Sequence, residues 1–394
     1  MEEKAPMIGR RVYYVSGFDP RGAPYYHGFF AKQLNTFIER TGRPLALGSR
    51  RKAEQGLLSR WQVREEGSGN EHVCDLDYCF LHWDDIVRRS WMRDPLRLLW
   101  SGLLMCRYYL LQGALWRIGR MSYPVALCGL APVIVTLLTV LAAVLAAYLM
   151  GSLARAMQLV APLPGLLAFA IALGVTVGAW QLAELLGVVW MFRGMQFTRL
   201  LGQCDDGELR QRLVLQAKAI LELEQGEPAA EILVVGHSIG SFVMAMLVAE
   251  MRRQPGFAAI APRLSLLTLG QSLPFLAEQA SAKAFHLDLE ELTREPRLPW
   301  RDVSSRDDFL CFPGVDPYGC CGLRNPPPAY PEMDLIPLCQ RQGLTSHWQL
   351  IKGQLGLHFE YLATAEPERS GGFDYMELVL RPAMIAAQAR PSLA

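Results

Sequence analysis

Two long stretches in the middle of the chain lack charged residues and dominate its pattern of hydrophobic and polar positions. Residues 121–154 and 156–183 contain no Asp, Glu, Lys or Arg, and only Arg155 separates them. About 20 apolar residues suffice for a helix to cross a bilayer, and each stretch exceeds that length. A Pro-x-Pro-Gly sequence at 162–165 favours a turn between them. The pattern predicts a two-helix transmembrane hairpin over residues 121–192, with two buried helices of a soluble core as the alternative.

The stretch before the hairpin, residues 91–120, has an amphipathic helical pattern. It starts with Asp94 and Pro95, which are typical of an N-cap followed by the first helical position. Apolar residues then fall on one stripe with arginines around it: Leu96, Leu99, Trp100, Leu103, Leu104, Tyr108, Leu111 and Leu115, with Arg93, Arg97, Arg107, Arg117 and Arg120. A basic amphipathic helix rich in Trp and Leu is typical of a membrane interface. We therefore expect an interfacial helix, with a surface helix packed on the protein's own core as the alternative.

Cationic residues indicate the orientation of the hairpin. Arginines precede the first span and follow the second, whereas the connecting turn holds only Arg155. Because positively charged flanks stay in the cytoplasm, we expect both ends of the chain there and a short tip outside. The first span contains small residues that permit close helix packing, namely Ala142, Ala143, Ala146 and Ala147. The packing could be within the hairpin or between copies of the chain, so a homo-oligomer is left open.

Outside the hairpin, short apolar runs alternate with helical patterns. Helical patterns extend to about Arg40 and over residues 204–228, between strand-like runs at RVYYVSGF, LSRWQVREEG, HVCDLDYCFLHW, EILVVG, RLSLLTLGQSLP, AKAFHLDL and LPWRDVSS. This alternation predicts an α/β fold with a mostly parallel sheet. Two spans return the chain to its starting side, so the early and late strands can share that sheet. The proline-rich stretch 311–337 is expected to be irregular.

The pattern divides the chain into four parts. Residues 1–90 are the first part of the α/β domain, 91–120 the interfacial helix, 121–192 the hairpin, and 193–394 the second part of the α/β domain.

Composition excludes several classes of protein. The 39 Lys and Arg residues balance 38 Asp and Glu residues, which argues against a nucleic-acid binder. The nine cysteines lack the spacing of a disulfide framework or a zinc site, so we expect reduced thiols in the cytoplasm and no metal. The first 17 residues contain no apolar signal core.

The sequence ILVVGHSIGS, residues 232–241, places Ser238 in a Gly-x-Ser-x-Gly turn between an apolar strand and an apolar helix. Such a turn exposes the serine side chain, and its glycines avoid clashes with neighbouring elements. The helix that follows directs backbone N–H groups towards an oxyanion formed beside the serine. We interpret Ser238 as a nucleophile, with a serine that merely caps the helix as the alternative.

A nucleophilic serine needs a histidine base and an orienting carboxylate. The expected chain order is serine, acid, histidine. Asp307 and Asp308 lie in the loop after a strand, where sheet enzymes place their chemistry, and residue types alone do not separate them. His347 and His358 are the candidate bases, because His286 precedes the acid loop and falls within a predicted strand.

These motifs together resemble the α/β-hydrolase superfamily. VYYVSGFDPRG, HWDDIVRR and HFEYL look like a group of uncharacterised bacterial membrane-associated serine hydrolases. The resemblance covers the chain outside the hairpin. Matching Trp300, Ser304 and Ser305 to the acid-loop pattern of these proteins implies Asp308 as the acid, and the late His-aromatic-x-Tyr-Leu pattern implies His358 as the base.

The resemblance also implies two oxyanion donors, the backbone N–H groups of Phe18 and Ile239. The loop departs from the common His-Gly form, and it leaves two roles for Arg21, either pairing with Asp19 or binding an acidic substrate group. The implied protein is a cofactor-free esterase or lipase-like enzyme of the bacterial inner membrane. It faces the cytoplasm and cleaves an acyl ester or thioester. An acyltransferase with the same triad and a non-catalytic membrane interaction protein are the alternatives.

Overall fold

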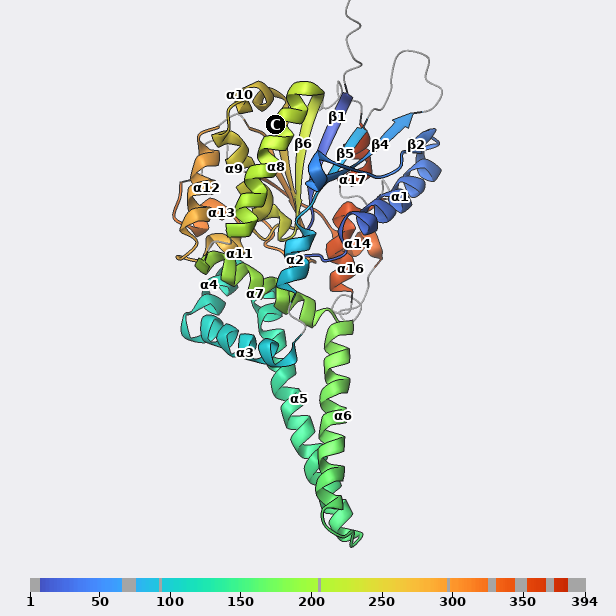
Figure 1. Ribbon diagram of the computed structural model, residues 1–394, viewed down its shortest axis with the longest axis vertical. Helices are drawn as coiled ribbons and strands as arrows, with labels where there is room; N and C mark the ends of the chain where they lie inside the picture. The colour runs from blue at the N-terminus through green and yellow to red at the C-terminus, as the bar shows by residue number, and fades with distance from the viewer. Residues whose placement is uncertain are drawn as a thin grey trace, which may run out of the picture. The chain divides into compact units, whose positions relative to one another are not determined.

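The computed structural model describes residues 8–65, 76–91, 94–204, 207–295, 298–324, 331–343, 353–365 and 372–381 (Figure 1). The chain forms two compact units. The first combines Met1–Trp91 with Thr198–Ala394, and the second is Met92–Phe197. The segments before and after the apolar insertion therefore share one unit.

A mixed sheet of nine described strands organises the first unit. The strand order is β2-β4-β5-β1-β6-β7-β8-β9, and β3 pairs with β4. From β5 to β9 neighbouring strands are parallel, whereas β4 runs antiparallel to β5, β2 and β3. The strands are β1 Ile8–Val15, β2 Leu45–Leu47, β3 Arg51–Ala53, β4 Leu58–Glu65, β5 Leu76–Leu81, β6 Ala229–His237, β7 Leu264–Leu269, β8 Trp300–Ser304 and β9 Glu332–Leu335. The predicted α/β fold with a sheet shared by early and late strands is confirmed.

Helices cover both faces of this sheet, as the alternation of side chains along β1 shows. Val12 and Tyr14 pack into a core with α1 and α17, whereas Tyr13, on the opposite face, contacts Glu224 of α8. The helices of this unit are α1 Gly22–Thr41, η1 Glu54–Gly56, α2 Asp84–Ser90, α8 Gly207–Gly226, α9 Gly240–Arg253, α10 Phe257–Ile260, η3 Ala261–Arg263, α11 Leu273–Ala277, α12 Lys283–Thr293, α13 Pro317–Cys320, α14 Leu338–Gln342, α16 Gln354–Phe359, η4 Glu360–Leu362 and α17 Tyr375–Leu380.

Two sequence predictions about this unit are wrong. The stretch AKAFHLDL, predicted as a strand, lies in α12, where Phe285, Leu289 and Leu292 are buried at helical spacing. The Ala, Leu, Lys and Glu residues of α12 favour a helix over the strand that a short alternation suggested. The stretch 311–337, predicted as irregular, contributes β9 to the sheet edge. This four-residue strand is only partly buried, so it has no apolar run to reveal it.

The second unit is helical, and its elements are α3 Pro95–Cys106, the π-helical η2 Arg107–Leu111, α4 Ala114–Met121, α5 Tyr123–Ala156 and α6 Leu163–Leu185. Helix α7, Val188–Cys204, extends from this unit into the first. The single helix predicted over 91–120 is thus divided, because Gly113 adopts φ +70° and ends the π-helical turn before α4.

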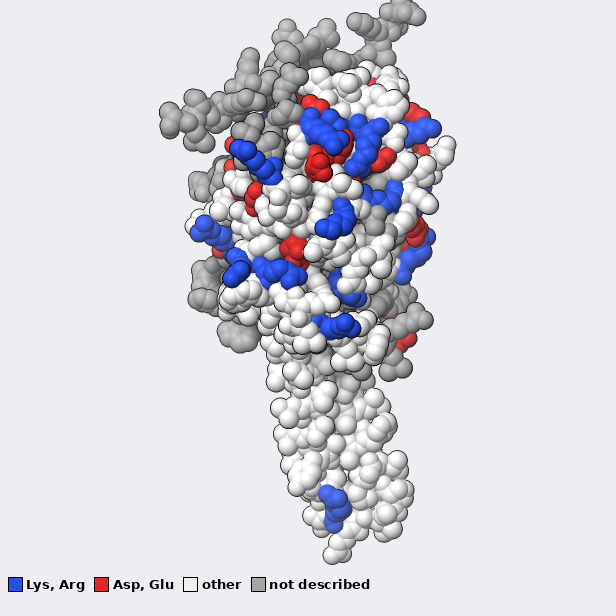
Figure 2. Space-filling model, turned by 90° about the vertical axis from the view of Figure 1, so that its left-hand side faces the viewer, with Lys and Arg blue, Asp and Glu red and all other residues white. Residues whose placement is uncertain are grey.

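Helices α5 and α6 lie side by side as a hairpin (Figure 1). Both are long and apolar enough to cross a membrane by length and composition. No residue of the most apolar window of α5 is buried, and Figure 2 shows a surface of the hairpin almost without charged side chains. A soluble core helix would bury such residues, so their exposure favours a transmembrane hairpin.

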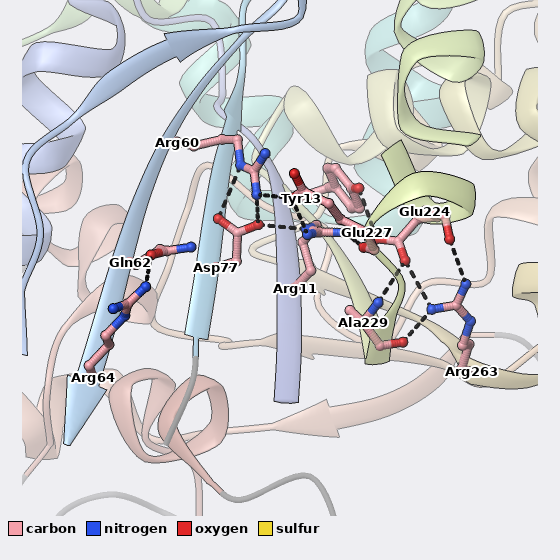
Figure 3. A network of polar contacts seen from close by, with 10 residues as sticks. All are labelled: Arg11, Tyr13, Arg60, Gln62, Arg64, Asp77, Glu224, Glu227, Ala229 and Arg263. Atoms are coloured by element: carbon pink, nitrogen blue, oxygen red, sulfur yellow. Dashed lines mark hydrogen bonds and ion pairs between the residues drawn. The ribbon is translucent and has the colours of Figure 1, made fainter. Parts of the chain in front are cut away.

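A buried ion network ties the central strands to α8 (Figure 3). Arg11 of β1 is fully buried and donates from Nε to Asp77 of β5 at 2.6 Å and from Nη1 to Glu224 of α8 at 2.8 Å. Arg60 donates to the Asp77 carboxylate at 2.7 Å, and Arg263 to that of Glu224 at 3.0 Å. Each buried charge therefore has an opposite partner, as burial of ions requires.

Candidate active site

Ser238 occupies a strained turn between β6 and α9. Its φ of +56° lies in the left-handed region, which is uncommon for a residue with a side chain. A Cβ at Gly236 would lie 2.7 Å from the carbonyl oxygen of Gly240, and one at Gly240 would lie 2.4 Å from that of Val15. Both glycines of the motif are therefore required by close backbone contacts, as a nucleophile turn predicts.

Asp308 and His358 form a buried pair. Asp308 follows β8, His358 lies on α16, and His358 Nδ1 is 2.7 Å from Asp308 Oδ2. Burial raises the pKa of Asp308, but the charge and hydrogen bond of His358 lower it more, so the net pKa is below its usual value. An ionised carboxylate can only accept, so Nδ1 donates to Asp308, and Nε2 is the ring nitrogen left for another partner. Among the described residues, that buried Nε2 has no hydrogen-bond partner.

Further hydrogen bonds orient the carboxylate. Tyr361 donates its hydroxyl to Asp308 Oδ2 at 3.1 Å, and the Leu310 N–H donates to Oδ1 at 2.9 Å. The acid is therefore held in one orientation towards His358.

The ends of β6 and β7 place Ser238 and His358 at the same edge of the sheet. The Ser238 N–H donates to the Leu269 carbonyl at 2.9 Å. The next residue, Gly270, has φ +53°, and a Cβ there would lie 3.2 Å from His358 Cε1. On the other side, the ring of His237 lies 4.9 Å from that of His358. Ser238 therefore bonds to Leu269 and follows His237, while His358 lies near Gly270 and His237.

His237 has a supporting position that the sequence analysis did not assign. Its Nε2 lies 2.8 Å from the His358 carbonyl oxygen, which can only accept, so Nε2 carries the proton. Burial, together with the nearby His358, lowers the pKa of His237 to about 3. A neutral imidazole can neighbour a His358 cation without repelling it. The only sequence signal is its place inside the Gly-x-Ser-x-Gly motif.

The other candidate acids and bases have different partners. Asp307 Oδ2 accepts the Cys339 N–H at 2.9 Å, and no hydrogen bond joins Asp307 to His358 in the described structure. His286 lies on α12 with Nε2 2.9 Å from the Ala277 carbonyl oxygen. His347 lies outside the described residues.

The two predicted oxyanion donors belong to backbone segments that adjoin Ser238. Ile239 precedes the first residue of α9, so its N–H lies at a helix N-terminus. Phe18 lies in the loop between β1 and α1, next to Gly17, where a Cβ would lie 3.1 Å from Ser238 Cβ. The Phe18 ring is buried and stacks on Trp91 at 5.6 Å.

Asp19 and Arg21 pair with each other in the same loop. Arg21 donates from its backbone N–H at 2.9 Å and from Nη2 at 2.6 Å to the Asp19 carboxylate, and Tyr26 donates its hydroxyl at 3.0 Å. The guanidinium also lies 3.6 Å from the centroid of the Tyr25 ring. Of the two roles open to Arg21, the structure shows the pairing that holds the loop.

Asp302 lies inside β8. Its raised pKa leads us to predict that the stability of the protein depends on pH. Burial raises its pKa to about 7, although hydrogen bonds from Ser304 and Thr268 lower it. An unfolded Asp has a pKa of about 3.9, so the folded state binds the extra proton between pH 4 and 7. The free energy of unfolding should therefore fall as pH rises through that window, by at most about 4 kcal/mol.

The variant Asp302→Asn tests this, because an amide is neutral at every pH and can still accept from Thr268 and donate to Ser304. In thermal denaturation, the variant should melt above the wild type at pH 8, and the difference should shrink at pH 5. If the melting temperatures of the variant and the wild type differed equally at pH 8 and pH 5, the raised pKa of Asp302 would be contradicted.

Neither a protein-family model nor any curated protein or solved structure matches the chain. Within the described ranges, no group of three or more His, Cys, Asp and Glu side chains is arranged to hold a metal ion.

Proposed function

We propose that the protein is a membrane-anchored serine hydrolase of the α/β-hydrolase type that cleaves an acyl ester or thioester. The observation that carries the proposal is the meeting of three features at one sheet edge: Ser238 at φ +56° between strand and helix, His358 with an unpartnered Nε2, and Asp308 bonded to its Nδ1. Parallel sheets of this kind bind their ligands at the carboxyl ends of the strands.

The proposed mechanism follows from these positions. Ser238 Oγ attacks the carbonyl carbon of the substrate while His358 Nε2 takes its proton, and Asp308 stabilises the resulting imidazolium. The N–H groups of Phe18 and Ile239 stabilise the oxyanion. Collapse of the tetrahedral intermediate breaks the bond to the leaving group, which receives the proton from His358. Water, deprotonated by the same nitrogen, then hydrolyses the acyl-enzyme and restores Ser238.

The helical unit has the residues of a membrane-associated segment. From residue 95 to 183 the chain has five arginines and no acidic residue. Large apolar side chains of η2 and α4 are exposed, among them Leu111 at 82% and Trp116 at 68%, and the Arg120 guanidinium lies 4.9 Å from the Trp116 ring centroid. Exposed aromatic and cationic side chains next to apolar spans suit a membrane interface. We infer that α3, η2 and α4 lie at the cytoplasmic surface of the cell membrane, which favours a substrate with an acyl chain.

The test uses membranes that contain the full chain and a fluorescent fluorophosphonate, which reacts only with activated serines. The wild type should be labelled, and the labelled band should stay in the pellet after an alkaline carbonate wash. Ser238→Ala should lose the label, whereas the matched control Ser281→Ala, at an exposed turn, should keep it.

Each part of the proposal can fail separately in this experiment. A folded wild type that is not labelled contradicts the hydrolase and favours the non-catalytic alternative. A labelled band released by carbonate contradicts the membrane hairpin. Transfer of the acyl group to an added alcohol, faster than to water, would identify an acyltransferase with the same triad.

A further inference from the structure

We propose that Trp83, Asp84 and Arg88 are positioning residues that hold the oxyanion loop, Ser16–Gly22, against Ser238. The inference rests on the proposed function, because it concerns the loop that carries the Phe18 N–H. It gives a role to the motif HWDDIVRR, whose side chains take no part in the mechanism above. This motif, residues 82–89, begins directly after β5 and continues into helix α2.

The oxyanion loop connects β1 to α1 and packs closely against the turn that carries Ser238. A Cβ at Gly17 would lie 3.1 Å from Ser238 Cβ and 3.5 Å from its Oγ. A Cβ at Gly240, at the start of α9, would lie 2.5 Å from the Ser16 carbonyl oxygen. A small shift of the loop would therefore move its N–H groups relative to the serine.

Two side chains of the motif bind the backbone of the loop at its two ends. Trp83 donates from Nε1 to the Ser16 carbonyl at 3.0 Å, and both residues are buried. Arg88 donates from Nη1 to the Pro20 carbonyl at 3.0 Å and also to the Asp84 carboxylate. Phe18 lies between these two anchors along the chain, so the carbonyls on both sides of its peptide segment are held.

Asp84 packs against the last residue of the loop. Gly22 has φ +70°, and a Cβ there would lie 2.5 Å from Asp84 Oδ2. His82 Nδ1 lies 2.9 Å from Asp84 Oδ1. Burial raises the pKa of Asp84, but His82 and Arg88 lower it more, so its pKa is below its usual value and the carboxylate is ionised at neutral pH. The carboxylate keeps Arg88 directed towards Pro20.

The motif is itself anchored on α8. Arg212 donates from Nη1 to the His82 carbonyl at 2.9 Å and to Asp85 Oδ1 at 2.9 Å. Gln216 donates to the same His82 carbonyl at 3.0 Å. The loop is therefore connected, through the motif, to the packed helix α8. Precise placement of an oxyanion donor requires such support from rigid elements.

The test compares Arg88→Met with the matched control Arg89→Met in the purified full chain, using a 4-nitrophenyl ester. Arg88 is about half exposed, so its loss should leave the melting temperature within a few degrees. We expect Arg88→Met to lower kcat about tenfold with KM within twofold, because displaced donors weaken transition-state stabilisation and not substrate binding. The affinity for a boronic acid, whose adduct resembles the tetrahedral intermediate, should fall in parallel. Arg89 pairs with Asp85 and Glu208, away from the loop, and its variant should retain kcat.

Further variants separate positioning from a general structural role. Arg88→Lys, which keeps a cation beside Asp84, should recover part of kcat, and the pH profile of kcat/KM should not move, because the triad is intact. Trp83→Phe should show the same split between kcat and KM, at a temperature below its own melting transition. Unchanged kcat in Arg88→Met and Trp83→Phe would overturn the positioning role while leaving the hydrolase intact. A wild type without activity or fluorophosphonate label would overturn the proposed function and the positioning role together.

Discussion

Asp308→Asn should lower kcat by about 10⁴-fold, the loss expected when the acid of a serine triad can no longer orient its histidine. The amide oxygen of the variant could still accept from His358 Nδ1–H. Its N–H₂ group would instead donate to an unprotonated Nδ1, which stabilises the wrong tautomer of His358. It would also remove the negative charge that stabilises the imidazolium. The effect is measured as the rate of ester hydrolysis and of fluorophosphonate labelling.

Asp307→Asn is the matched control, because the neighbouring carboxylate accepts the Cys339 N–H and has no bond to His358. Its kcat should stay within about twofold of the wild type. His358→Ala should lose activity to a similar extent as Ser238→Ala, since triad members act as a unit, while His347→Ala should keep it. A loss confined to Asp307→Asn or His347→Ala would reassign the triad.

Arg11→Ala should destabilise the α/β unit by about 3–5 kcal/mol, the cost of leaving buried partner charges uncompensated. Asp77 and Glu224 both lose a donor inside the protein, and both side chains are fully buried. Arg60 and Arg263 still contact these carboxylates, which keeps the loss from being larger. The measurement is the midpoint of urea unfolding of the detergent-solubilised chain, followed by tryptophan fluorescence.

Arg64→Ala is the control for this prediction. Arg64 lies on β4, which β5 separates from β1 in the sheet. Its side chain is exposed and donates to Gln62 (Figure 3). Its replacement should change the free energy of unfolding by no more than about 0.5 kcal/mol. Equal midpoints for the Arg11 and Arg64 variants would mean that the buried network does not support the fold.

Local patterns predicted much of the fold. The apolar runs of β1, β5, β6, β7 and β8 and the hairpin helices α5 and α6 were all predicted from their own residues. Elements with weak local patterns were missed. Strand β9 has four partly exposed residues, and the alternation in AKAFHLDL was too short to separate a strand from the helix that forms there.

The candidate site was predictable to the extent that its motif is local. Ser238 and its two glycines lie within five residues, the helix begins at the second glycine, and strand, turn and helix are visible in the sequence. The acid and base are far away along the chain, and the residues alone left Asp307 and Asp308 open. A resemblance separated them, and in the structure it is Asp308 that contacts His358.

By itself the sequence determined an α/β domain interrupted by two long apolar helices, and a serine in a tight strand-to-helix turn. These depend on hydrophobic periodicity and on backbone preferences of neighbouring residues. Only the tertiary structure decided that Arg21 pairs with Asp19, that His237 contacts the backbone of His358, and that HWDDIVRR binds the loop Ser16–Gly22. Those contacts depend on which side chains the packing of β5, α2, α8 and α16 brings together, and polar side chains carry no periodic signal of their distant partners.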